Sequence, residues 1–160
     1  MSQLPIPIPS EILRECYQHG RKTYPEEACG VISGPVEEPT LLNRFHPIAN
    51  ILGVLHEEDP ERYPRTPADG YVLDSKAYIK LDKELSARGE KIKVIFHSHV
   101  DVGAYFSEED KKQATWGDEP LFPEMVYLVC GIKNGRPDGS ILVRFNPETR
   151  SFEEFPIVEP

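Results

Sequence analysis

The most constraining feature of the sequence is the run Met125–Ile132, which is apolar at nearly every position. Successive side chains of a strand point to opposite faces of the sheet, so a strand of this kind is buried on both faces. The sheet that contains it must then be covered by other elements on each side. The run therefore predicts a layered α/β fold, because a half-solvated antiparallel sheet would show alternating polar residues.

Other segments supply the strands and helices that such a fold needs. The pattern predicts a helix that has Ser10 as its N-cap and fades near Gly20, and a second helix that begins after Asp74 and ends at Gly89. Because strands and helices mix without strict alternation, we expect a mixed sheet flanked by helices. Further strands are predicted at Ala28–Gly34, at one or two places within Leu41–Ile51, and at Lys91–His99, Ile141–Phe145 and Phe152–Ile157.

Chain length and charge limit the classes of protein that fit. A chain of 160 residues is expected to form one domain, here residues 1–160. Residues 53–70 are charged and contain three prolines, which predicts a long irregular loop. The chain has no membrane-length apolar run and no secretory signal, so we expect a cytoplasmic protein. The net charge of −9 argues against binding to nucleic acid or to an anionic membrane, since both need basic patches.

Two histidines separated by one residue, His97 and His99, come at the carboxyl end of a predicted strand. Side chains two apart on a strand share a face, so both imidazoles can reach one point. After seven residues, Ser107-Glu-Glu-Asp110 predicts the start of a short helix that ends near Trp116. Zinc suits two imidazoles and a carboxylate, and three protein ligands leave one position open, as in catalytic sites. The spacing therefore predicts a catalytic zinc site.

The spacing of these residues resembles the HxHx7SxxD signature of the JAMM (MPN+) metallopeptidases. An upstream segment with a proline, Glu27 and then Gly30 three residues later is similar to another block of that family. The expected order of elements over residues 10–132 also follows the family. The resemblance implies the family's α/β architecture, a mixed sheet flanked by helices that is related to the architecture of cytidine deaminases.

The resemblance also implies roles for individual residues. His97, His99 and Asp110 would bind one Zn²⁺ per chain, and Glu27 rather than Glu26 would be the general acid/base. Ser107 would stabilise the oxyanion through its hydroxyl group.

The family further implies hydrolysis after the C-terminal Gly-Gly of a ubiquitin-like protein. The short chain is similar to compact prokaryotic members that process sulfur-carrier proteins of the ThiS, MoaD and CysO type.

Several alternatives stay open at this point. The same residues would serve an isopeptidase that removes ubiquitin-like modifiers from conjugates. A non-catalytic MPN scaffold module is a further possibility, although such modules typically lose one or more of these residues. Fe(II) or Co(II) can occupy the same ligands, and the oligomeric state is left open. Asp101 lies in a run close to the HxHxDH motif of metallo-β-lactamase-like hydrolases, but Val102 replaces its last histidine, so Asp101 is predicted to be a loop residue.

Overall fold

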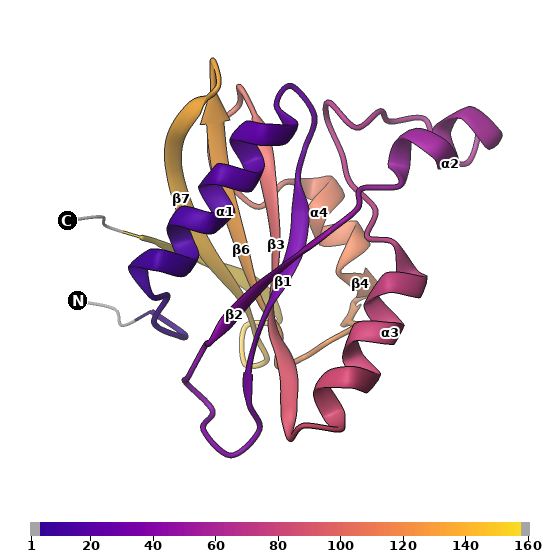
Figure 1. The fold of residues 1–160 in the computed structure, drawn as a ribbon. Helices are drawn as coiled ribbons and strands as arrows, with labels where there is room; N and C mark the ends of the chain where they lie inside the picture. The colour runs from indigo at the N-terminus through magenta and orange to yellow at the C-terminus, as the bar shows by residue number, and fades with distance from the viewer. Residues whose placement is uncertain (1–3, 158–160) are drawn as a thin grey trace.

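A computed structural model describes residues 4–157 and shows a six-stranded mixed sheet with helices on both faces (Figure 1). The strand order is β2-β1-β3-β6-β7-β8, in which only β3 and β6 run parallel to each other. The expected mixed sheet flanked by helices is confirmed. That residues 1–160 form one domain stays a prediction, and residues 1–3 and 158–160 lie outside the described range. The elements are α1 (Ser10–Thr23), β1 (Cys29–Pro35), β2 (Arg44–Ile48), α2 (Leu52–Glu58), α3 (Ser75–Ser86), β3 (Glu90–Val100), α4 (Glu108–Gln113), β4 (Thr115–Trp116), β5 (Glu119–Pro120), β6 (Val126–Lys133), β7 (Arg136–Asn146) and β8 (Ser151–Pro156).

Two hydrophobic clusters lie on opposite faces of the sheet. One forms beneath α1 and includes Val94 and Phe96 of β3. The other forms on the face where α3 and α4 lie and includes Ile95. Strand β6 contributes to both clusters, as its continuous apolar pattern predicts. Because side chains alternate along β3, His97 and His99 share a face with Ile95 and project toward α4.

Helix α1 differs from the predicted helix at both ends. Its N-cap is Pro9, and Ser10 is the first helical residue and makes no capping hydrogen bond. The helix also continues past Gly20, because this glycine packs closely on the sheet; a Cβ there would lie 3.1 Å from the Ile132 side chain. The helix ends at Thr23, just before Tyr24–Pro25. Proline disfavours helical geometry at the residue that precedes it, here Tyr24.

The segment 53–70 is less irregular than predicted, since α2 occupies its first part. The Asn50 side chain holds together the two backbone segments that flank residues 53–70. Its Oδ1 accepts hydrogen bonds from the backbone N–H groups of Leu52 and Val72, at 3.1 and 3.0 Å. Within residues 4–157, no helix is both long and apolar enough to cross a membrane.

The C-terminal half also shows two differences from the expected boundaries. Helix α4 stops at Gln113 because Thr115 and Trp116 pair with Glu119 and Pro120 in a small two-stranded sheet. The predicted strand Ile141–Phe145 is part of the longer β7, which lies between β6 and β8. The site described below lies on β3 and at the start of α4, so neither difference changes it.

Candidate metal centre

The two histidines lie near the carboxyl end of β3, where it runs parallel to β6. His97 is paired with Cys29 of β1 on one side and with Val129 of β6 on the other. In α/β proteins, ligands bind beyond the carboxyl ends of parallel strands. Both imidazoles are almost fully buried, with 0% and 3% of each residue exposed. The sheet therefore presents two adjacent imidazoles at a position where α/β folds form sites.

The third predicted ligand, Asp110, is held in place by the start of α4. Ser107 is the N-cap, and its Oγ accepts a hydrogen bond from Asp110 N at 3.1 Å. In return, Asp110 Oδ2 accepts one from Ser107 N at 3.0 Å, which completes a capping box. The expected N-cap is confirmed, and the cap directs the Asp110 carboxylate toward β3.

The three predicted ligands meet in a nearly equilateral triangle of donor atoms. His97 Nε2 lies 3.2 Å from His99 Nε2 and 3.2 Å from Asp110 Oδ2, and His99 Nε2 lies 3.1 Å from the same oxygen. Two ligands of a tetrahedral zinc ion, each 2.0–2.1 Å from the metal, are about 3.3 Å apart. The donor atoms therefore fit a single tetrahedral ion with one position left open.

The two imidazoles are oriented by different contacts. His99 Nδ1 lies 3.1 Å from the Gly103 carbonyl, which can only accept, so Nδ1 carries the proton and Nε2 offers its lone pair. The His97 ring stacks on Tyr71, with centroids 4.3 Å apart, and its Nδ1 has no hydrogen-bond partner in the described part of the chain. Burial lowers the pKa of His97, although Asp110 opposes this effect. The neutral form that metal binding requires is therefore favoured.

The Asp110 carboxylate is ionised in this setting. Burial alone would raise its pKa, but the adjacent imidazoles of His97 and His99 and the hydrogen bond from Ser107 N hold the pKa of Asp110 well below its usual range. An ionised carboxylate between two neutral imidazoles is the protonation state that a zinc ligand set needs.

Glu27 lies beside this triangle, just before β1. Its backbone N–H donates to the Pro67 carbonyl at 2.7 Å, and its carbonyl accepts from Asn50 Nδ2 at 3.0 Å. The following residue, Ala28, donates its N–H to Ser98 Oγ at 2.8 Å, which gives Ser98 the structural role of anchoring this segment to β3. Three hydrogen bonds from separate segments thus fix the backbone that carries the glutamate.

The Glu27 carboxyl group is buried and directed at the donor triangle. One of its oxygens and one nitrogen each of His97 and His99 all lie within 4.8 Å of one another. Asp110 contacts both imidazoles at 3.1–3.2 Å, so it is the closer candidate for the third ligand, and Glu27 stands one step further out. Glu27 Oε1 has no hydrogen-bond partner among residues 4–157. Burial first, and then the charge of Asp110, raise the pKa of Glu27 to about 9.

In the metal-free protein, Glu27→Gln is expected to raise the free energy of unfolding by about 3 kcal/mol at neutral pH. The folded protein keeps the Glu27 proton up to about pH 9, whereas the unfolded chain releases it near pH 4.5. The stability that this group contributes is complete below pH 4.5 and is lost as the pH rises toward 9. Glutamine does not titrate, so the difference between variant and wild type should grow with pH. Urea unfolding with a chelator, at about pH 5 and about pH 8, checks this, and a difference independent of pH would contradict it.

Some residues around the site have no sequence signal that could have revealed them. Tyr71, which stacks on His97, and Asn50, which anchors Glu27, both lie in irregular segments without periodicity.

Asp101 is a loop residue, as predicted, and lies in a left-handed conformation with φ of 61°. Its carboxylate accepts hydrogen bonds from Tyr24 Oη and Asn134 N, both at 2.9 Å, and so ties the loop after β3 to two other segments.

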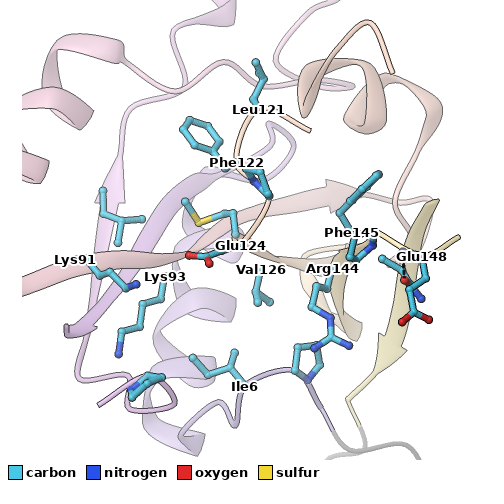
Figure 2. A pocket seen from close by; sticks show the side chains of 17 residues that line it. Ile6, Lys91, Lys93, Leu121, Phe122, Glu124, Val126, Arg144, Phe145 and Glu148 are labelled. Carbon is cyan, nitrogen blue, oxygen red and sulfur yellow. Dashed lines mark hydrogen bonds between the residues drawn. The ribbon is translucent and has the colours of Figure 1, made fainter. Parts of the chain in front are cut away.

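A cavity of about 1240 Å³ lies away from the donor triangle (Figure 2). It is lined by Lys91 and Lys93 from the start of β3 and by Arg144 near the end of β7, together with Leu121 and Phe122. No residue of the predicted site lines it. This cavity therefore belongs to the opposite end of β3 from the histidines.

The fold and the donor triangle together define a class, namely α/β proteins with a ligand set for one metal ion beside a buried glutamate. Residues 9–141 match the sequence family of prokaryotic homologs of the JAB domain. The chain belongs to this family.

The chain is similar to a peptidase and to a probable protease. The chain is 33% identical over 111 residues to the CysO-cysteine peptidase of Mycobacterium tuberculosis, a match that covers 69% of this chain. It spans 66% of that peptidase, slightly less than two thirds of its length. The chain is also 28% identical over 126 residues to the probable TtuB-protein conjugate cleaving protease of Thermus thermophilus, covering 79% of this chain and 72% of that protein.

Two solved structures resemble the fold. A protein from Salinibacter ruber has a TM-score of 0.61 and 26% identity, and the match covers 95% of this chain and 90% of that one. Protein DSY2949 from Desulfitobacterium hafniense has a TM-score of 0.65 and 22% identity, and the match covers 93% and 88% of the two chains. The second likeness supports the fold alone.

Proposed function

We propose that this protein is a zinc-dependent peptidase that hydrolyses the peptide bond after the C-terminal Gly-Gly of a ubiquitin-like sulfur-carrier protein. The observation that carries the proposal is the triangle of His97, His99 and Asp110 donor atoms, with edges of 3.1–3.2 Å, beside the buried carboxyl group of Glu27. Family membership and the similarity to a CysO-cysteine peptidase and to a probable TtuB-protein conjugate cleaving protease support the reaction and the kind of substrate.

In the proposed reaction, each residue near the triangle has a separate task. A bound zinc ion supplies a Lewis acid that lowers the pKa of water and polarises the scissile carbonyl. Glu27 accepts a proton from the attacking water and delivers it to the departing amine. Ser107 Oγ accepts the Asp110 N–H, which leaves the hydroxyl proton available to donate to the oxyanion.

The raised pKa of Glu27 suits this exchange of a proton. A carboxyl group with an ordinary pKa is a weak base and would hold the proton poorly between the two transfers. Burial raises the pKa of Glu27 in the metal-free protein, and the positive charge of a bound zinc ion would lower it again, toward the range in which proton transfer in both directions is efficient near neutral pH.

Isopeptide cleavage is the second candidate function. It is favoured by one observation, the similarity to a relative whose name describes cleavage of protein conjugates. The same residues would perform the chemistry in either case, and the substrates differ only in the amine that leaves. A non-catalytic scaffold role is disfavoured, because all five residues that the resemblance assigns to the reaction are present.

The proposal is tested with sulfur-carrier proteins that carry one residue after Gly-Gly. We expect the zinc-loaded protein to remove that residue, which intact-mass spectrometry detects as the loss of one residue mass. A carrier with valine in place of the last glycine is the matched control and should be cut far more slowly, since glycine lets the backbone approach the metal closely. If both carriers remain intact while zinc is bound, the proposal fails. A carrier joined to a lysine side chain, tested in parallel, separates the second candidate function.

A further inference from the structure

Arg65 lies in the segment between α2 and α3, next to the candidate metal centre. Its Nη1 is 4.0 Å from Glu109 Oε2, in the first turn of α4. On the other side, its Cζ lies 3.1 Å from the position that a Cβ on Gly70 would occupy, and the next residue, Tyr71, stacks on His97. These contacts place the guanidinium between the start of α4 and the segment that covers His97.

The charge of Arg65 acts on Glu27. Burial is the main cause of the raised pKa of Glu27, and Arg65 opposes it. Arg65 also adds to the effect of burial in lowering the pKa of His97. Both effects agree with the contacts of Arg65 to Glu109, next to Asp110, and to Gly70, next to Tyr71, which place its guanidinium at the border of the candidate metal centre.

Arg65 makes only a long ion pair within the chain. Its ion pair with Glu109 is the longest in the described part of the chain, and 31% of the Arg65 side chain is exposed. Glu109 has a second cation, Lys112, 3.5 Å away on α4. A guanidinium has five N–H donors in a planar fork that matches a carboxylate. Arg65 can therefore exchange Glu109 for an incoming carboxylate while Lys112 keeps Glu109 paired.

We propose that Arg65 binds the free α-carboxylate of the single residue that leaves on hydrolysis. This inference rests on the proposed function and narrows its substrate class. A residue directly after the scissile bond holds its carboxylate about one residue length, ~3.5 Å, from that bond. Arg65 contacts Glu109 and Gly70, the sequence neighbours of Asp110 and of the Tyr71 ring that covers His97, and it is partly exposed, so an incoming carboxylate beside the metal centre can reach it. A longer extension, or a lysine side-chain linkage, places no negative charge there.

The test compares two carriers that end in Gly-Gly plus one residue and differ only in a C-terminal carboxylate or carboxamide. With zinc-loaded wild-type protein, kcat/KM should be about 10- to 100-fold higher for the carboxylate, the range expected for a charge-assisted hydrogen bond. Arg65→Ala should reduce this ratio to about 1 by slowing only the carboxylate substrate, and Arg65→Lys should restore part of it. Arg62→Ala, which removes a nearby arginine that stacks on Tyr63, is the matched control and should keep the wild-type ratio.

A purely structural role for Arg65 gives different results. If Arg65 served only to pair with Glu109, then Glu109→Gln would remove the discrimination as Arg65→Ala does; we expect Glu109→Gln to keep it. The inference is overturned if the wild type cuts both carriers equally, or if Arg65→Ala slows both by the same factor, and the proposed function survives either result. If neither carrier is cut, the proposed function fails and this inference fails with it.

Discussion

Replacing Glu27 with glutamine is expected to lower kcat by at least about 100-fold while the protein still binds one zinc ion per chain. Glutamine keeps the size and shape of the side chain but cannot accept the proton from the attacking water. Glu27 is the outer member of the cluster, and Asp110 is the closer third donor, so metal binding should be retained. Turnover of a carrier substrate and zinc content measured by atomic emission on the same sample check both parts.

The matched control for this variant is Glu26→Gln. Glu26 is the neighbouring carboxylate, it is exposed, and a change there should leave turnover close to the wild-type value. Full activity in Glu27→Gln would show that Glu27 is not the general base. A loss of zinc in the same variant would instead make Glu27 a ligand, which would contradict the arrangement proposed here.

Asp110→Asn is expected to weaken zinc binding by more than about 100-fold and to abolish turnover. Changes in groups that merely support a ligand cost 10- to 100-fold in metal affinity, so loss of a charged ligand should cost more. Asparagine keeps an oxygen that can accept from Ser107 N, so the helix cap should be retained. The effect is therefore expected on the metal and only slightly on the fold.

Thermal unfolding with and without zinc measures this difference. A ligand that binds only the folded state stabilises the protein, and the gain grows with the logarithm of the ligand concentration divided by Kd. Zinc should raise the Tm of the wild type and of Glu108→Gln, a neighbouring exposed carboxylate that pairs with Lys111. It should leave the Tm of Asp110→Asn almost unchanged. An equal zinc-dependent rise in all three proteins would remove Asp110 from the ligand set.

The triangle of candidate ligands could be predicted from the sequence because the residues that form it are close in the chain. His97 and His99 share a strand face, and Ser107 sets the start of the helix that carries Asp110, so spacing alone brings them together. Glu27 is different, since it reaches the histidines only through the pairing of β1 with β3, in which Cys29 lies opposite His97. The register of a strand pair cannot be read from the chain, and the role of Glu27 was inferred from the family resemblance.

The irregular segment before α3 was the least predictable part. Its contribution to the site depends on single contacts, such as Tyr71 stacking on His97 and the Asn50 amide bonding to the Glu27 carbonyl. Such contacts leave no periodic pattern in a sequence. Boundaries were also shifted where packing overrode local preference, as at Gly20, which stays helical because it lies against Ile132.

Asp110 Oδ2, which completes the capping box of α4 by accepting from Ser107 N, also lies between the two imidazoles. A six-residue helix is too short to be stable alone, and forming its first turn is the costly step. The geometry that orders this turn is also the geometry that completes the ligand set. We therefore expect metal binding to stabilise the first turn of α4 and the segment that follows β3, since the same carboxylate takes part in both.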